Sequence, residues 1–190
     1  MLYRHDLRLF QHSSRVAELC LQIGEQLRLS ENDLRNVVKA AFLHDIGKTR
    51  ISANILNTPG PLSKEQWEKV KMHPIWGSEI FNEDATIQKG IITHHENYDG
   101  SGYPFRLKKE NIHIFGRIIA IADSIDAMTA IRSYRQPISM IQAIREVQEC
   151  SGVKYDPYIV DKFVKSDKAI LKGIGCPQRA LELRKIIIYT

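Results

Sequence analysis

Cysteine and long apolar runs are scarce in this sequence. Among its 190 residues are only three cysteines, Cys20, Cys150 and Cys176, and no two of them form a CxxC pair. This odd number and wide spacing argue against a disulfide scaffold or a zinc ribbon. No apolar run approaches the length of a membrane span, and the N-terminus lacks the apolar segment of a secretory signal. We therefore expect a cytoplasmic protein without a membrane segment.

A strong excess of charge is also missing. The chain has 27 Lys and Arg against 22 Asp and Glu, a net charge of +5. A basic balance suits a polyanionic partner such as a nucleotide, a nucleic acid or a lipid headgroup. Solvated lysines on helix faces would equally account for the net charge of +5. No Lys/Arg run is dense enough for a DNA-binding patch, so DNA is not an expected partner.

Alternating strand patterns, internal repeats and low-complexity segments are absent, and the periodicity is helical nearly throughout. An apolar stripe at helical spacing predicts a first helix, and its members are Val16, Leu19, Cys20, Ile23 and Leu27. Ser30 to Asp33 is typical of a capping box that opens a second helix, which Gly47 is expected to end. Ser63 and Gln66 form another capping box, which predicts a helix that runs to about Met72 and a bend in the chain at Pro74. The remaining predicted helices are 85–95, 114–131, 139–151 and 157–166.

These helices predict an all-α bundle in a single domain that spans residues 1–190. One domain of this length can bury a sizeable core. The tail, 167–190, allows either a strand or a docked helix end at residues 186–189.

Side chains that bind divalent metals recur in separate motifs. They are His12, His44, Asp45, His73, His94, His95 and Asp123. A lone histidine on a helix is more often a structural residue than a ligand, and His5 and His113 are assigned to that class. Asp45 and Asp123 differ, because each follows an apolar helical segment. A buried carboxylate must be protonated or neutralised by a cation. Asp126 lies one turn after Asp123 and shares its face.

The stretch "HHENYDGSGYP", residues 94–104, places two histidines at a predicted helix end and a glycine-rich turn behind them. Gly100 and Gly102 allow a positive φ and close backbone approach, and Pro104 stiffens the exit. Five imidazoles and two carboxylates exceed the needs of one tetrahedral zinc. The set suits two metals that share a bridging carboxylate, an arrangement that recurs in phosphate-ester hydrolysis.

Together, four motifs resemble the HD-GYP domain, a branch of the HD superfamily of metal-dependent phosphohydrolases. The motifs are "HDIGK" (44–48), "MHPIWG" (72–77), "HHENYDGSGYP" (94–104) and "AIADSIDAM" (120–128). The resemblance covers about residues 10–165. It implies a bundle of five core helices with additional C-terminal helices and a binuclear iron or manganese centre. The implied activity is hydrolysis of cyclic di-GMP to pGpG and often on to GMP.

The resemblance also assigns roles to residues. His12, His44 and Asp123 would hold one ion, His73, His94 and His95 the other, and Asp45 would bridge them. Lys48, Arg132 and Arg135 correspond to basic residues that contact the ligand. Asp126 would fix a histidine tautomer or accept a proton. Asp99, Gly102 and Tyr103 belong to the substrate side, and Tyr103 faces either the site rim or a partner such as a diguanylate cyclase (GGDEF) domain.

One departure concerns the number of metals. Some family members carry a glutamate one turn before the first histidine, which helps to hold a third ion. Arg8 occupies that position here and cannot ligate a metal, so two ions are expected. Arg8 would lie near a substrate phosphate or be a solvated helix residue.

In the predicted mechanism, a hydroxide that bridges the two metals would attack phosphorus in line with the leaving 3′-oxygen. Lys48 would stabilise charge on the non-bridging oxygens. Two alternatives stay open: a hydrolase of a related cyclic or linear dinucleotide, and an inactive module that binds a cyclic dinucleotide or a protein. All seven expected ligands are present, which favours the enzyme. A sensory domain is a further expected partner.

Overall fold

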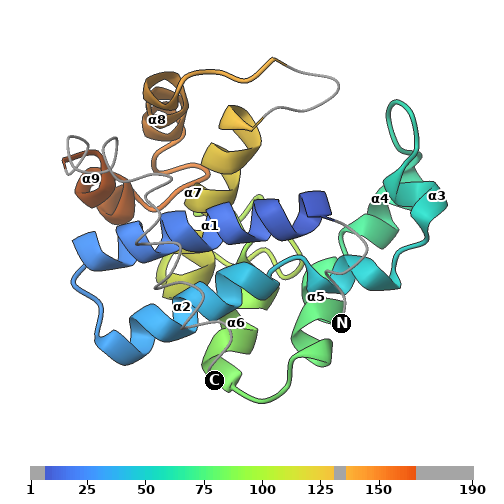
Figure 1. The fold of residues 1–190 in the computed structure, drawn as a ribbon, viewed down its shortest axis with the longest axis horizontal. Coiled ribbons are helices and arrows are strands. Elements are labelled where there is room, and N and C mark those ends of the chain that lie inside the picture. The colour runs from blue at the N-terminus through green and yellow to red at the C-terminus, as the bar shows by residue number, and fades with distance from the viewer. Residues whose placement is uncertain (1–6, 131–135, 166–190) are drawn as a thin grey trace.

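The fold is a bundle of helices (Figure 1). The computed structural model describes residues 7–130 and 136–165, and within these ranges it contains no strand. The predicted all-α class is therefore confirmed. The elements are α1 (Leu7–Gln26), α2 (Glu31–Leu43), the 3₁₀ turn η2 (Ile46–Arg50), α3 (Ala53–Leu56), α4 (Lys64–Val70), α5 (His73–Ile80), α6 (Ala85–Thr93), the 3₁₀ turn η3 (Lys109–Asn111), α7 (Ile114–Thr129), α8 (Met140–Glu149) and α9 (Pro157–Lys165).

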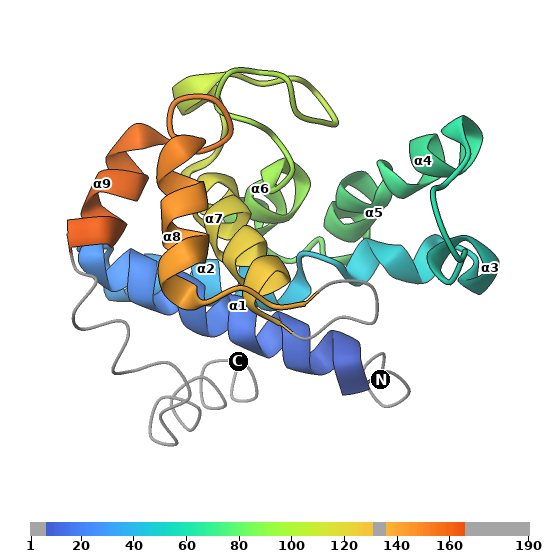
Figure 2. The same ribbon diagram turned by 90° about the horizontal axis from the view of Figure 1, so that it is seen from above.

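The core lies where α1, α2, α6 and α7 meet. Helix α1 packs on α2 and α7, and α6 packs on α2, α5 and α7. Four members of the predicted α1 stripe, Val16, Leu19, Cys20 and Ile23, are buried, and Leu27 is partly buried against the same core. Helices α8 and α9 lie at one end of the bundle, and α3 and α4 lie at the other (Figure 2). None of the helices in the described ranges has the length and apolar character needed to cross a bilayer.

Capping side chains begin the helices where the sequence predicts. Ser63 and Gln66 make a reciprocal capping box at the start of α4, and Ser139 does the same with Gln142 at α8. Ser30 caps α2 by accepting a hydrogen bond from the backbone N–H of Asp33. Each bond satisfies an N–H that has no partner within its helix.

The predicted role of Gly47 was wrong. Helix α2 ends at Leu43, and Gly47 lies inside η2. A Cβ atom on Gly47 would come within 2.0 Å of the carbonyl oxygen of His73 and 2.5 Å of the amide nitrogen of Gly77. The glycine is therefore needed because η2 packs directly on the backbone of α5.

Helix α5 was not predicted as a separate element, because the sequence indicated only a bend at Pro74. Pro74 lies in the first turn of α5, where a missing N–H costs no helical hydrogen bond. The first residue of this helix is His73, which is buried. Outside the described side chains lie Arg8, Arg132, Arg135 and the tail 167–190.

Candidate metal centre

The seven predicted ligands come from five helices and meet in one place. His12 is within α1, and Asp123 is within α7. His44 and His94 are the C-terminal caps of α2 and α6, so Asp45 and His95 follow directly where each helix ends. His44 and His94 keep helical backbone angles, whereas Asp45 has left the helical region with a φ of −96° and a ψ of 4°, so the spacing of α2 no longer fixes its direction.

Two groups of potential metal ligands share Asp45. Its Oδ2 atom lies 3.5 Å from Nε2 of His44 and 3.7 Å from Nε2 of His12. Its Oδ1 atom lies 3.3 Å from Nε2 of His73, in the group that also contains His94 and His95. This arrangement gives each carboxylate oxygen its own set of imidazoles, as a bridging ligand requires.

Asp123 lies beside the first of these groups, next to His12. Its Oδ1 atom lies 3.4 Å from Nε2 of His12, and its side chain is about one quarter exposed (24%). All seven predicted ligands are therefore brought together around Asp45.

Asp45 is ionised. Burial alone would raise the pKa of this carboxyl, but the charge of Lys48, the largest opposing cause, holds the pKa well below its usual range. Lys48 donates a hydrogen bond of 2.6 Å from Nζ to Oδ2. Within the described residues, Oδ1 is buried and accepts no hydrogen bond. A buried carboxylate oxygen without a donor is suited to a cation.

Three histidines are held in the tautomer that metal binding needs. Nδ1 of His44, His73 and His94 lies 2.6, 2.7 and 2.6 Å from the backbone carbonyl oxygen three residues earlier. A carbonyl oxygen can only accept, so Nδ1 carries the hydrogen. In a neutral ring Nε2 then has a free lone pair.

Nε2 atoms of these histidines face other Nε2 atoms in two pairs. Nε2 of His12 lies 3.3 Å from Nε2 of His44, and Nε2 of His73 lies 3.3 Å from Nε2 of His94. Burial lowers the pKa of His73 to about 4 and lowers the pKa values of His94 and His95 well below the usual range. His73, His94 and His95 are therefore neutral near pH 7, and the facing nitrogens of His73 and His94, without a shared proton, are compatible with a cation between them. The pKa of His12 is raised instead, because the lowering by burial is outweighed by its hydrogen bond to Asp126 and by the charges of Asp123 and Asp45. The residues present therefore fit bound divalent metals.

A second layer of contacts orients His12. Its Nδ1 atom lies 2.7 Å from Oδ2 of Asp126, which is buried on α7 one turn beyond Asp123. Arg15 donates to both oxygens of Asp126, with Nη2 at 3.1 Å from Oδ2. This ion pair holds Nε2 of His12 toward Asp45. The contact of Asp126 with a histidine was predicted from the sequence, whereas Arg15, one turn after His12, was not.

The loop after His95 is fixed by backbone and carboxylate contacts. The amide of Tyr103 donates to the carbonyl oxygen of His95. Buried Glu96 accepts hydrogen bonds from the amides of Phe105 (2.7 Å) and Leu107 (3.1 Å). Glu96 was not among the predicted site residues, although its place directly after the histidine pair was a signal.

Gly100 and Gly102 have different structural roles in this loop. Gly100 has a φ of 86°, which glycine adopts at little cost. A Cβ atom on Gly102 would come within 2.3 Å of the amide nitrogen of Asn97, so Gly102 is needed for close approach. Of the predicted substrate residues here, Gly102 and Tyr103 line a pocket. Asp99 is exposed and accepts a hydrogen bond from the amide of Ser101, a contact that shapes the turn.

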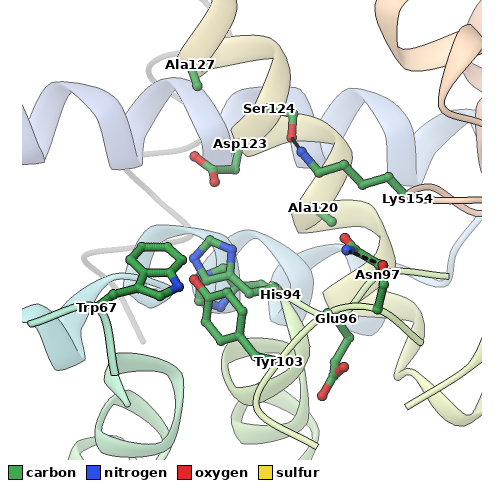
Figure 3. Close-up of a pocket in the computed structure, with 13 residues that line it drawn as sticks. Trp67, His94, Glu96, Asn97, Tyr103, Ala120, Asp123, Ser124, Ala127 and Lys154 are labelled. Atoms are coloured by element: carbon green, nitrogen blue, oxygen red, sulfur yellow. Dashed lines mark hydrogen bonds between the residues drawn. The ribbon is translucent and has the colours of Figure 1, made fainter. Parts of the chain in front are cut away.

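An open pocket of about 370 Å³ lies beside the second histidine group (Figure 3). His94 and His95 contribute to its lining, and Figure 3 shows Asp123 across from His94. Trp67 of α4 and Lys154 also line it. Neither was predicted from the sequence, because neither belongs to a motif and each reaches the pocket only through the fold.

Comparison with known proteins gives matches over most of this chain. The HD-domain family profile matches residues 1–159. A Thermotoga maritima protein named cyclic di-GMP phosphodiesterase is 41% identical over 170 residues, which cover 87% of this chain and 46% of the relative. A Vibrio cholerae protein named 3′3′-cGAMP-specific phosphodiesterase 2 is 39% identical over 155 residues, or 79% of this chain and 30% of the relative. The chain thus spans less than half the length of these relatives.

The solved structures support the fold. The crystal structure of the cyclic GMP-AMP-specific phosphodiesterase V-cGAP3 of V. cholerae matches with a TM-score of 0.73 and 20% identity. The match covers 93% of this chain and 49% of that one.

Proposed function

We propose, from the premise that this chain belongs to the HD-domain family, that it is a metal-dependent phosphodiesterase that hydrolyses a cyclic dinucleotide. The observation that carries the proposal is the sharing of ionised Asp45 by two groups of histidines whose Nε2 atoms face one another. Such a site would hold two cations close together, which is the arrangement that phosphate-ester hydrolysis uses repeatedly.

Cyclic di-GMP is the proposed substrate. The T. maritima relative named for this substrate supports it. A second candidate is 3′3′-cGAMP, which the name of the V. cholerae relative supports. Both molecules are cyclic dinucleotides with two purine bases and two phosphodiester groups, so a site of the same chemical kind would accept either.

Two divalent ions would occupy the centre. His12, His44 and Asp123 would hold one, His73, His94 and His95 the other, with Asp45 common to both. Imidazole and carboxylate ligands without thiolates suit iron or manganese. Bound there, the ions would supply Lewis-acid activation of water and of the scissile phosphate.

The residues around the ions have separate tasks in this proposal. Lys48, whose ammonium group touches Asp45, would donate to a phosphate oxygen as negative charge develops. Asp126 and Arg15 would keep Nε2 of His12 directed at the ion. Tyr103 and Gly102 would contact the substrate in the pocket. Asp99, Arg132 and Arg135 remain predicted substrate residues.

The location of the protein, its partners and the number of its metal ions are also proposals. A cytoplasmic location, a GGDEF-domain partner and a sensory domain remain predictions. The same is true of the two-ion stoichiometry that Arg8 indicates.

The test is turnover of cyclic di-GMP by anaerobically purified protein loaded with Fe(II) or Mn(II). The expected products, separated by chromatography, are pGpG and GMP. Asp45→Asn keeps the side-chain shape but removes the shared anion, so we expect both metal content and turnover to be lost, with turnover down at least ~1000-fold. Asp161→Asn, on the exposed face of α9, is the matched control.

A different outcome would favour the inactive binding module. If loaded wild-type protein binds cyclic di-GMP without hydrolysing it or 3′3′-cGAMP, the enzyme proposal fails. If Asp45→Asn retains its full metal content, the assignment of the shared ligand fails.

A further inference from the structure

Trp67 is placed at the mouth of the pocket and is 45% exposed. Exposing nearly half of the largest apolar side chain forgoes much of the free energy that its burial would provide. Trp67 belongs to α4, which begins with the Ser63–Gln66 capping box, so its backbone is held by local hydrogen bonds. A capped helix therefore presents an aromatic side chain to the open pocket.

Aromatic rings continue from the histidine cluster to Trp67. Tyr103 stacks on His95, with ring centroids 4.8 Å apart and planes inclined by 26°. Trp67 meets Tyr103 edge to face, with centroids 6.1 Å apart and planes inclined by 76°. Trp67 thus extends the aromatic wall outward from the proposed metal site.

The facing wall comes from α7. Residues at positions i, i+3, i+4 and i+7 line the pocket, and these are Ala120, Asp123, Ser124 and Ala127. Three of these side chains are small, so they leave room opposite the aromatic pair. Figure 3 shows Trp67 and Tyr103 on one side of this space and the α7 residues on the other.

We propose that Trp67 stacks against a purine base of the bound cyclic dinucleotide. The inference rests on the proposed function and adds a residue that determines affinity. The scissile phosphate would lie at the histidine cluster. A base of the same cyclic dinucleotide would lie beside it, along the aromatic side chains of Tyr103 and Trp67. Stacking on one aromatic side chain changes affinity by roughly 10- to 100-fold.

Stacking also predicts that Trp67 does not select between purine bases. Every base has a π-face, so this contact does not distinguish guanine from adenine. Trp67 would increase the affinity for cyclic di-GMP and 3′3′-cGAMP by similar factors.

The first test is steady-state kinetics of Trp67→Leu and Trp67→Phe with both cyclic dinucleotides. Trp67→Leu should raise KM roughly 10- to 100-fold for both, and Trp67→Phe should recover most of the loss because it keeps a π-face. The kcat should change little, and metal content should equal that of the wild type. Trp76→Phe, which alters the other tryptophan, half-buried in α5, is the control.

The second test does not require turnover. In Trp76→Phe protein the remaining tryptophan is Trp67, and its fluorescence should be quenched when cyclic di-GMP is added. In Trp67→Phe protein, where Trp76 remains, the quenching should be absent at a concentration that saturates binding.

The outcomes separate this inference from the proposed function. Turnover by the wild type with an unchanged KM in Trp67→Leu would overturn the stacking role and leave the enzyme proposal intact. Quenching of Trp67 without turnover would support stacking and contradict the enzyme. Absence of both quenching and turnover contradicts both.

Discussion

The Nε2 atoms of His73 and His94 lie 3.3 Å apart, and each ring donates its Nδ1 hydrogen to a backbone carbonyl oxygen. Two neutral imidazoles in these tautomers present lone pairs to each other. A hydrogen bond cannot form between them, whereas a cation can be bound by both. The close approach of these two histidines therefore lowers the stability of the metal-free fold, and bound metal would remove this destabilisation.

Metal should stabilise the fold as a consequence. Ligand at 100 times its dissociation constant adds about 2.7 kcal/mol to the free energy of unfolding. For a chain of this size we expect Tm to rise by ~5–10 °C when Mn(II) is added to chelator-treated protein. Differential scanning fluorimetry over a Mn(II) titration measures the shift. A Tm that is independent of Mn(II) would contradict metal binding at the two groups.

Arg15→Leu should weaken metal binding without touching a proposed ligand. The substitution removes both hydrogen bonds that Arg15 donates to Asp126 and so loosens the contact that orients His12. Loss of such a supporting contact lowers metal affinity roughly 10- to 100-fold. Isothermal titration with Mn(II) measures it, and Arg35→Leu, at an exposed pair on α2, is the control. Equal affinities in both variants would show that the Arg15–Asp126 pair is only structural.

Gly47→Ala should destabilise the protein more than another glycine substitution. The added methyl group would overlap the backbone of His73 at 2.0 Å, which forces η2 away from α5. Overpacking typically costs about 1–3 kcal/mol and occasionally more, and this contact involves rigid backbone. Denaturant unfolding measures the change.

Gly60→Ala is the comparison for this substitution. No atom lies within 4 Å of its added Cβ, so only the positive φ of 99° is penalised. That penalty is ~1 kcal/mol. Equal losses of stability in the two variants would refute the packing explanation for Gly47.

Lys154→Ala should raise KM for a cyclic dinucleotide. Lys154 is the one lysine or arginine among the described residues that line the pocket, and its ammonium group lies 3.1 Å from Ser124 Oγ. A hydrogen bond to a charged phosphate is worth about 1.5 kcal/mol or more, so a roughly 10-fold rise is expected. Lys165→Ala on α9 is the control, and steady-state kinetics provide the measurement. A KM equal to that of the control would place Lys154 outside the substrate contacts.

Local signals in the sequence predicted most helices well. Ser63 and Ser139 begin α4 and α8 because a side-chain oxygen satisfies an amide only a few residues away. The HD-domain resemblance is confirmed by the profile match and by the relatives. Gly47 was misread because a glycine after a helix resembles a helix end, and the long-range contact with His73 that explains it has no local signature.

The candidate site likewise contains residues that local motifs predicted and residues that only the fold brings to it. The motifs predicted the seven potential ligands, since carboxylates within apolar segments need neutralisation. Arg15 was missed although it lies one turn after His12, because its partner Asp126 is 111 residues away. Trp67 and Lys154 were missed because only the pocket relates them to His94 and His95.

By itself, the sequence determined the helical class, most of the caps and the set of side chains able to bind metal, because these depend on residue type and on neighbours within one or two turns. The tertiary structure decided that Asp45 is shared by two groups, that Nε2 atoms face one another, and that Trp67 continues the wall begun by Tyr103. These relationships depend on how α1, α2, α5, α6 and α7 pack, and contacts between distant segments set that packing.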